Sequence, residues 1–390
     1  MMRYLLRFNW PLALCAAALT VLGVVFIGSA GAARSVVALQ TAWRSHAVTA
    51  IGGFALMFAL AALDYRKLLD WAALPYFALS LILLVTVLLL GSRIYGGRRW
   101  LWFFQPSEVA KLATILVLAL VVGRSGDRLC GFRGFLVDMA LLVPPILLIL
   151  AEPDLGTALV LVPTAVAMLL AARIWAKGIL VLLLVGTLAA GTVLGAVKFA
   201  GQCSDPDRRA RIYACLPFKP HQLARLKTFV DPDADPYGSG WNLRQAKISI
   251  GSGSLSGKGI GRGEAKFLGY LPPSVSMNDF IFAVLAEEAG FIGAVATLLL
   301  FFGMFASGTY TALRCMDDRG RLVVVGVMTL LFSHAYINIA MSIGLMPITG
   351  LPLPFISAGK TFLMVTCAAL GLVHSVAVHG RASSKLKVKS

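Results

Sequence analysis

Runs of about 20 apolar residues recur along the whole chain, and each is long enough to cross the hydrocarbon core of a bilayer. Hydrophobic residues make up 58% of the 390 residues and charged residues only 14%, a balance that water-soluble domains do not show. The chain is therefore predicted to be an all-α polytopic membrane protein that forms a single integral membrane domain over residues 1–390. Ten transmembrane spans are expected, at approximately 9–29, 46–63, 72–91, 106–123, 135–151, 156–172, 178–199, 280–307, 322–344 and 353–377.

The net charge of +17 is distributed unevenly between the two sides of these spans. If the N-terminus lies inside, the inner segments carry 16 of the 35 Lys and Arg residues, and the outer loops carry few apart from Arg98, Arg99 and the segment 200–278. Long loops cross a membrane largely regardless of charge, so the positive-inside rule predicts that both termini are cytoplasmic. The basic excess is thus a topology signal, and binding to nucleic acid is not expected. The first span is expected to be a retained helix, because its apolar run is long for a signal peptide and many spans follow.

Segment 200–278 is the one large extracytoplasmic loop expected within this domain. It holds eleven Lys and Arg and six Asp and Glu residues, and it is too small and too glycine-rich to bury a core of its own. It is expected to fold over the outer mouth of the bundle, with a short amphipathic helix at 242–250 on the membrane surface. Cys203 and Cys215 share this loop. An oxidising compartment would allow a disulfide between them, which we favour over two free thiols.

Asp279 stands at the outer end of the expected eighth span. Ser276 and Asp279 have the spacing of a capping box, and an acidic first turn complements the helix dipole, so spacing alone favours a helix cap. The alternative is a general base at the mouth of an active site, whose pKa the helix dipole would keep low. The two roles do not exclude each other. Glu287 and Glu288 lie two turns deeper, where ionisable groups usually mark function or pairing.

Other charged residues are expected at the outer ends of the spans. Glu108 and Lys111 are i,i+3 neighbours within ~8 Å of the start of the fourth span. A self-neutralising pair and a phosphate contact made by Lys111 or Arg99 are both compatible with this spacing. Asp154, in the turn after the fifth span, either caps the next helix or faces the same cavity as Asp279.

The glycine-rich segment 251–263 does not match a nucleotide-binding motif. A Walker A pattern ending at Lys258 lacks its first glycine and its Ser or Thr, and the Rossmann spacing fails at Glu264. A main-chain nest for pyrophosphate, helped by Lys258 and Arg262, and a flexible loop both remain open. The Cys and His residues show no metal-ligand spacing.

Five segments together resemble the SEDS (shape, elongation, division, sporulation) membrane proteins, over nearly the whole chain. RRWLWFFQPSEVAKLA is similar to the family's RW…QPSE-x-x-K segment, and EPDLGTALV is similar to its QPDLGTA turn. DPYGSGWNLRQAKISIGSGSLSGKG resembles the DPLGAGY…QS…IGSGG…GKG pattern of the RodA-like branch. DFIFAVLAEEAGFIG resembles DFIF-x-x-x-EE, and GLMPITGLPLPFISAG resembles GLLPVTGIPLPFISYGG. The chain departs from these patterns at Glu152 (usually Gln), Ala246 (usually Ser), 273–278 and 358–361.

The resemblance implies a peptidoglycan glycosyltransferase of the bacterial inner membrane that polymerises lipid II outside the membrane, for cell elongation and rod shape. It implies a class B penicillin-binding transpeptidase and other elongation-complex membrane proteins as partners. It implies that Asp279 is catalytic, and that the substrate is bound by Arg99, Glu108, Lys111, Asp154, Gln245 and Lys258.

The implied reaction is a single inverting displacement with undecaprenyl pyrophosphate as the leaving group, for which one carboxylate base is enough. The leaving group needs Lys, Arg or a divalent cation such as Mg²⁺ or Mn²⁺ bound with the pyrophosphate, and no separate protein metal site is expected. Two other classes of function stay open. These are a flippase or transporter of a lipid-linked precursor, for which the sequence shows no inverted repeats or paired broken helices, and a non-catalytic cell-wall scaffold.

Overall fold

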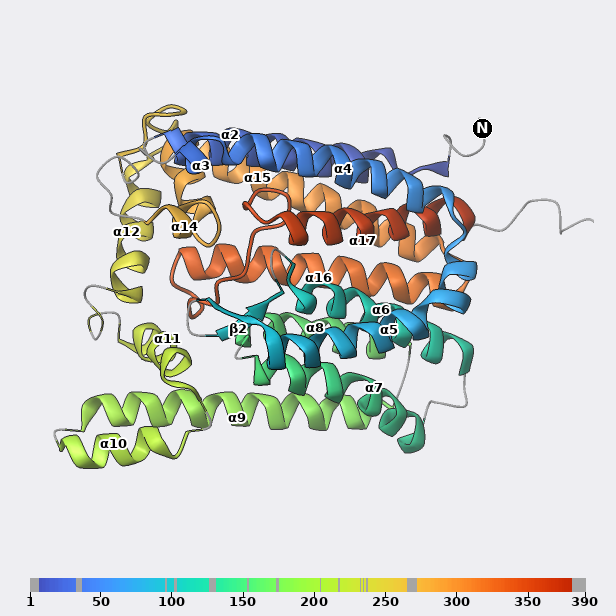
Figure 1. The fold of residues 1–390 in the computed structure, drawn as a ribbon, viewed down its shortest axis with the longest axis horizontal. Helices are drawn as coiled ribbons and strands as arrows, with labels where there is room; N and C mark the ends of the chain where they lie inside the picture. Colours follow the sequence, from blue (N-terminus) through green and yellow to red (C-terminus); the bar gives the residue numbers. More distant parts are fainter. Residues whose placement is uncertain are drawn as a thin grey trace, which may run out of the picture.

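The chain forms a bundle of long helices that run roughly along one direction (Figure 1). The computed structural model describes residues 7–32, 37–94, 97–101, 104–125, 131–152, 154–172, 175–203, 205–216, 218–231, 233, 235, 238–264 and 272–380. Within them, nine helices are long and apolar enough to cross a membrane, and α8 (Leu155–Ala171) is apolar but shorter. The nine are α2 (Trp10–Ala32), α4 (Ala42–Ala62), α5 (Tyr65–Leu90), α6 (Pro106–Ser125), α7 (Phe132–Ala151), α9 (Ala176–Gln202), α15 (Ile281–Arg314), α16 (Asp318–Ser342) and α17 (Lys360–His379). The predicted all-α polytopic architecture is confirmed.

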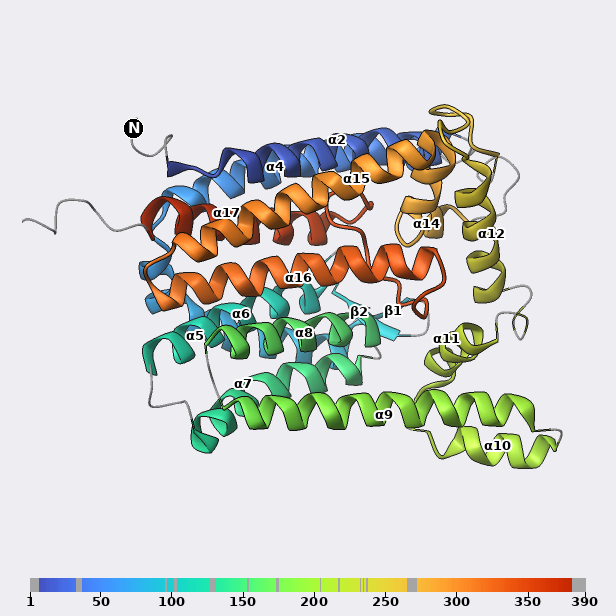
Figure 2. The same cartoon turned by 180° about the vertical axis from the view of Figure 1, so that it is seen from behind.

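The short elements gather towards one end of the bundle, on the left in Figure 1. The N-terminal end of α2 and the C-terminal end of α17 lie at the opposite end. They are α3 (Val37–Gln40), the antiparallel pair β1 (Ser92–Ile94) and β2 (Gly97–Trp100), α10 (Pro206–Ala214), α11 (Pro220–Val230), α12 (Ser239–Ser252) and α14 (Pro273–Ser276). The helix expected at 242–250 is confirmed as α12. It lies across the ends of the long helices and packs on α15 (Figures 1 and 2).

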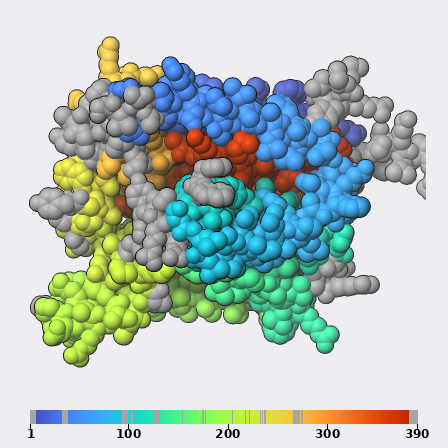
Figure 3. Space-filling model, in the orientation of Figure 1, coloured from blue at the N-terminus to red at the C-terminus, as the bar shows by residue number. Residues whose placement is uncertain are grey.

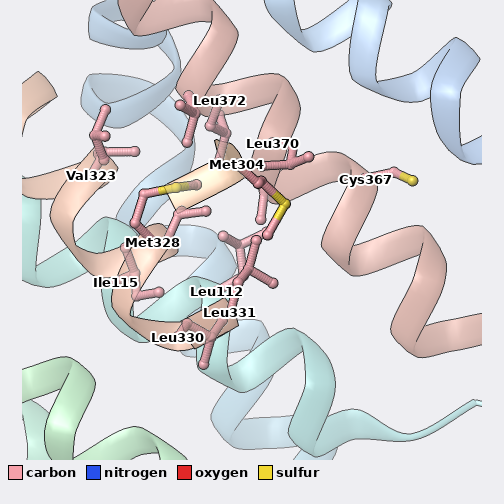
Figure 4. Close-up of a cluster of buried hydrophobic side chains, with 14 of the residues drawn as sticks. Leu112, Ile115, Met304, Val323, Met328, Leu330, Leu331, Cys367, Leu370 and Leu372 are labelled. Atoms are coloured by element: carbon pink, nitrogen blue, oxygen red, sulfur yellow. The ribbon is translucent and has the colours of Figure 1, made fainter. Parts of the chain in front are cut away.

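The core is centred on α6, α17 and α16. Buried residues make up 89%, 78% and 72% of the most apolar stretches of these three helices, but only 6% of that of α9, which forms one edge of the bundle (Figure 2). Figure 4 shows Leu112 of α6, Leu331 of α16, Met304 of α15 and Leu370 of α17 in one cluster. The edge helix therefore presents apolar side chains outward, as expected where lipid is the solvent.

Gly290 breaks α15 into two segments, although a continuous span was expected. Its φ of 68° and ψ of −168° are not helical. The Phe291 N–H donates to the Ser254 carbonyl at 2.8 Å, so the glycine-rich segment inserts at the break. A Cβ atom at Gly290 would lie 2.2 Å from the Gly257 nitrogen. Residues 291–314 alone are long enough to cross a core of ~30 Å.

The last helix begins at Lys360 rather than near residue 353. Pro352 and Pro354 bias Leu351 and Leu353 away from helical geometry, and Phe355 has a positive φ of 66°, so the helix begins only after this stretch. The loop is instead closed by a hydrogen bond from the Leu353 N–H to Ser357 Oγ, at 2.7 Å.

The favoured disulfide between Cys203 and Cys215 is wrong, because both thiols are free. The two residues flank α10, a helix of 9 residues. A helix of that length is about 13 Å long, whereas bridged cysteines need Cα atoms within about 7 Å. The bridge was favoured because both cysteines share one loop, and the helix between them was not expected from the sequence.

Replacing Gly290 with Ala should strongly destabilise the protein, because the new methyl group would clash with the Gly257 main chain and the positive φ disfavours any Cβ. We expect a melting temperature several degrees lower in detergent, measured by thermal unfolding. Gly186→Ala is the matched control: no atom lies within 4 Å of its Cβ position in α9, so stability should stay equal or rise slightly. Equal stability of the two variants would contradict the role of the break.

Candidate active site

Asp279 lies in the turn between α14 and α15, and two other parts of the fold hold this turn. Its main-chain carbonyl accepts a hydrogen bond from Asn338 Nδ2 at 3.0 Å, and the same amide donates to the Leu351 carbonyl at 2.7 Å. Ser357 Oγ donates to the Asn278 carbonyl at 2.6 Å. Asn338 is fully buried in α16, so α16 and the loop before α17 together fix the position of the Asp279 main chain.

The expectation that Asp279 caps α15 is wrong. The N-cap residue is Phe280, which makes no side-chain capping bond, and no described residue forms a hydrogen bond with the Asp279 carboxylate. Burial raises the pKa of this carboxyl to about 6, while Arg225 and Arg99 lower it. The low pKa expected from the helix dipole is therefore also wrong. The group is nevertheless mostly ionised at neutral pH and is available as a base.

Arg225 of α11 faces Asp279 across Gly350. Its Nη1 atom donates to the Thr349 carbonyl at 2.7 Å. A Cβ atom at Gly350 would lie 3.6 Å from both Nη atoms of Arg225 and 3.6 Å from Asp279 Oδ2. The guanidinium and the carboxylate thus border the same small space. The sequence did not single out Arg225, because it is one of eleven basic residues in 200–278 and no motif marks it.

Arg99 and Asp154 form the next part of the site. Arg99 Nη1 lies 4.0 Å from Asp154 Oδ1, and Arg99 Nε donates to the Glu152 carbonyl at 3.3 Å. Gln105 Nε2 donates to Asp154 Oδ2 at 3.2 Å. Asp154 also caps α8 by accepting from the Thr157 N–H at 3.2 Å. Since Arg99 and Asp154 both shift the pKa of Arg225, this pair belongs to the same charged cluster as Asp279.

Glu152 is completely buried beside this cluster, and neither carboxyl oxygen has a hydrogen-bond partner among the described residues. Burial, and then the nearby Asp154, raise its pKa to about 9, and Arg99 opposes this effect. Glu152 is therefore protonated at neutral pH. The cluster then contains two guanidinium groups, of Arg99 and Arg225, and two carboxylates, of Asp154 and Asp279.

Glu108 and Lys111 form a buried ion pair. Lys111 Nζ lies 2.9 Å from each Glu108 carboxyl oxygen and 2.8 Å from His334 Nε2. An ammonium group only donates, so Nε2 accepts and the His334 proton sits on Nδ1. The structure thus shows the self-neutralising pair, and a phosphate contact by Lys111 stays a prediction. His334 was expected to be a core residue, and nothing in the sequence indicated its contact with Lys111.

The glycine-rich segment forms a main-chain nest, but the anions in it are the chain's own carboxylates. The Gly261 and Gly263 N–H groups donate to Glu288 at 3.1 and 3.4 Å. Lys258 Nζ lies 2.9 Å from Glu287 Oε1. Of the two alternatives, the structure shows the nest, and Glu287 and Glu288 fill it, so a substrate contact by Lys258 stays a prediction.

Gln245 is buried in α12, and no hydrogen bond joins its side chain to Asp279 or Arg225 among the described residues. Its expected role in substrate binding also stays a prediction.

Comparison with known proteins gives consistent matches. The family model of the cell cycle proteins FtsW, RodA and SpoVE matches residues 9–382. The chain is 34% identical over 340 residues to the peptidoglycan glycosyltransferase MrdB of Escherichia coli, covering 85% of each chain. It is 38% identical over 334 residues to the probable peptidoglycan glycosyltransferase FtsW of Thioalkalivibrio sulfidiphilus, covering 82% of this chain and 76% of the relative.

The fold is similar to a chain in a solved peptidoglycan synthase complex, whose structure is described as coordinating polymerization and crosslinking. The TM-score is 0.72 at 29% identity, and the match covers 95% of this chain and 97% of the other.

Glu152→Gln should stabilise the protein increasingly as pH rises. The native state keeps its proton up to a pKa of about 9, whereas the unfolded state loses it near the ordinary Glu value of about 4.3. Between these values the native state binds more protons, so wild-type stability falls with rising pH, and Gln removes this loss. Melting temperatures from pH 5 to 9 should diverge between the two proteins. Asp207→Asn, which replaces an exposed carboxyl group, is the control, and its melting temperature should differ from wild type by the same amount at every pH. The same behaviour of Glu152→Gln would contradict the protonated state of Glu152.

Proposed function

This chain belongs to the family of FtsW, RodA and SpoVE, and on that premise we propose that it is a peptidoglycan glycosyltransferase that polymerises lipid II. One observation carries the proposal: the Asp279 carboxylate has no hydrogen-bond partner among the described residues and borders a small space shared with the Arg225 guanidinium. Asp279 is only partly exposed, and carboxylates with a raised pKa and no hydrogen-bond partner gather at functional sites. A base opposite a cation suits the transfer of a sugar from a pyrophosphate.

In the proposed reaction, the hydroxyl of one lipid-linked sugar attacks the anomeric carbon of another. The carbon–oxygen bond to the pyrophosphate breaks, the glycosidic bond forms with inversion, and the hydroxyl proton passes to Asp279. Undecaprenyl pyrophosphate leaves with the bonding electron pair. Arg225 and Arg99 stabilise the negative charge that develops on it.

We propose that any divalent cation arrives with the substrate pyrophosphate. Among the described residues, no group of three His, Cys, Asp or Glu side chains is placed to hold a metal ion. Mg²⁺ is commonly held by one or two carboxylates together with substrate phosphates, and Asp154 or Asp279 would fit that part. Mg²⁺ or Mn²⁺ would then help neutralise the leaving group.

We further propose a class B penicillin-binding transpeptidase as partner, together with other membrane proteins of the elongation complex. The similarity to a chain of a peptidoglycan synthase complex supports the transpeptidase. The assignment to elongation rests on the GKG sequence at 257–259, because the relatives include proteins named both MrdB and FtsW. The proposed location is the bacterial inner membrane, with both termini cytoplasmic and Asp279 at the outer face.

This orientation predicts which cysteines an impermeant thiol reagent reaches from outside. Cys215 is exposed at the end of the bundle that carries the loops, and Met316 is 77% exposed between α15 and α16. In right-side-out spheroplasts, Cys215 should be labelled, and the variant Met316→Cys should be labelled at its new cysteine only after permeabilisation. Mass spectrometry of the labelled peptides is the measurement. The reverse pattern would place Asp279 inside and exclude the proposed reaction.

Asp279→Asn should reduce lipid II polymerisation by ~10²-fold or more, because Asn cannot take up the proton. The wild-type rate should rise with pH around the Asp279 pKa of about 6 and then level off. Arg225→Gln should shift this rise to higher pH, since Arg225 lowers that pKa. The measurement is glycan formation by purified protein with its transpeptidase partner, using labelled lipid II. A rate near wild type for the Asn variant would remove Asp279 from catalysis and favour the transporter or scaffold classes.

A further inference from the structure

A cavity lies between the first turns of α4 and α17. It has a volume of about 290 Å³. In the space-filling view, red atoms of α17 are recessed below the blue surface of α4 (Figure 3). Its lining comes from the first turn of α4, including His46, and from Ala358, Gly359 and Lys360 at the start of α17.

The two helices run in the same direction, so both begin at this cavity. Gly53 of α4 packs on Cys367, and Gly371 of α17 packs on Met57, which puts the two helices in parallel register. The cavity therefore lies at two helix N-termini, where main-chain N–H groups and the helix dipoles favour an anion.

Two side chains indicate a ligand independently of the helix ends. Lys360 is exposed, and it forms no salt bridge within the described part of the chain. His46 is only 4% exposed, and its Nε2 lies 3.0 Å from the Phe355 carbonyl, which can only accept. Its Nδ1 atom is therefore an acceptor in the neutral ring, and no described residue bonds to it. The cavity thus offers a cation for a phosphate and a buried acceptor for a hydroxyl group.

The cavity is linked to the Asp279 turn through a short main-chain path. The Ala358 N–H donates to the Met277 carbonyl at 3.0 Å, and Met277 is two residues before Asp279. Arg225 contacts the other end of the same loop, at Thr349. The loop that holds the Asp279 turn therefore contacts Arg225 at Thr349 and leads at its other end to Lys360, the first residue of α17.

We propose that this cavity binds the pyrophosphate-bearing end of the acceptor lipid, an inference that rests on the proposed function. The donor's pyrophosphate leaves from the reacting carbon, so it must lie next to Asp279, at Arg225 and Arg99. The acceptor reacts through a hydroxyl at the far end of its sugars, so its pyrophosphate must lie farther from Asp279. Lys360 pairs with the acceptor phosphate there, and His46 Nδ1 accepts from a hydroxyl group of the adjoining sugar.

The test compares Lys360→Gln, which removes the charge, with Lys360→Arg, which keeps it. Loss of one charge-assisted contact should raise the KM for lipid II about tenfold with little change in kcat, and Arg should restore it. Lys198→Gln, an exposed lysine of α9 remote from the cavity, is the control and should match wild type. An unchanged KM for Lys360→Gln would overturn the assignment.

Binding without turnover separates this inference from the proposed function. Labelled lipid II is titrated onto the Asp279→Asn protein in phosphatidylcholine nanodiscs, with and without Lys360→Gln. Two molecules should bind, and Lys360→Gln should abolish or weaken one of them. If Lys360→Gln removes one binding site but the wild-type protein does not polymerise lipid II, the proposed polymerase function is refuted and the assignment of the cavity stands. If the wild-type protein polymerises lipid II and Lys360→Gln leaves lipid II binding unaltered, only the assignment of the cavity is refuted. If Lys360→Gln matters only in phosphatidylglycerol discs, the cavity holds a membrane phospholipid and the proposal fails.

Discussion

The position of Asp279 depends on how two buried carboxylates are stabilised farther along the same segment. Glu288 accepts from Ser29 Oγ at 2.7 Å and from the main chain of the glycine-rich segment. Glu287 pairs with Lys258 and accepts from the Glu264 N–H at 2.7 Å. Buried charges are tolerated only when paired or hydrogen-bonded, so these contacts hold the first segment of α15 against α2 and the loop. The opposite end of that segment carries Asp279.

Charge balance explains how a membrane-embedded site can accept a pyrophosphate. Arg99 and Arg225 face Asp154 and Asp279, so the cluster has no net charge when Glu152 is protonated. A further ionised carboxylate would make the cluster net negative and repel the substrate. Burial of Glu152 without a hydrogen-bond partner keeps it neutral, so it resembles in charge and size the Gln of the family's QPDLGTA pattern.

Local patterns in the sequence predicted the helices well and the contacts between distant residues poorly. Hydropathy located the ten apolar helices, because crossing a bilayer requires length and apolarity and little else. It missed the break at Gly290, since the apolar pattern continues through it, and the break depends on a loop more than 30 residues earlier. The glycine-rich segment was compatible with a main-chain nest or a flexible loop, and the structure shows a nest whose anions are carboxylates of α15. Arg225 and His334 were missed because only packing brings them to Asp279 and Lys111.

The buried Lys111 connects the two walls of the site. α6 starts beside Gln105, which bonds to Asp154, and Lys111 lies two turns deeper on the same helix. Through His334 the ammonium joins α6 to α16, and four residues further along α16 Asn338 holds the Asp279 main chain. Residues four apart share a helix face, so both contacts come from one side of α16. Lys111 therefore helps to set the distance between the Asp154 wall and the Asp279 wall. A charge buried this deeply suits that role, because leaving Glu108 unpaired would be strongly unfavourable.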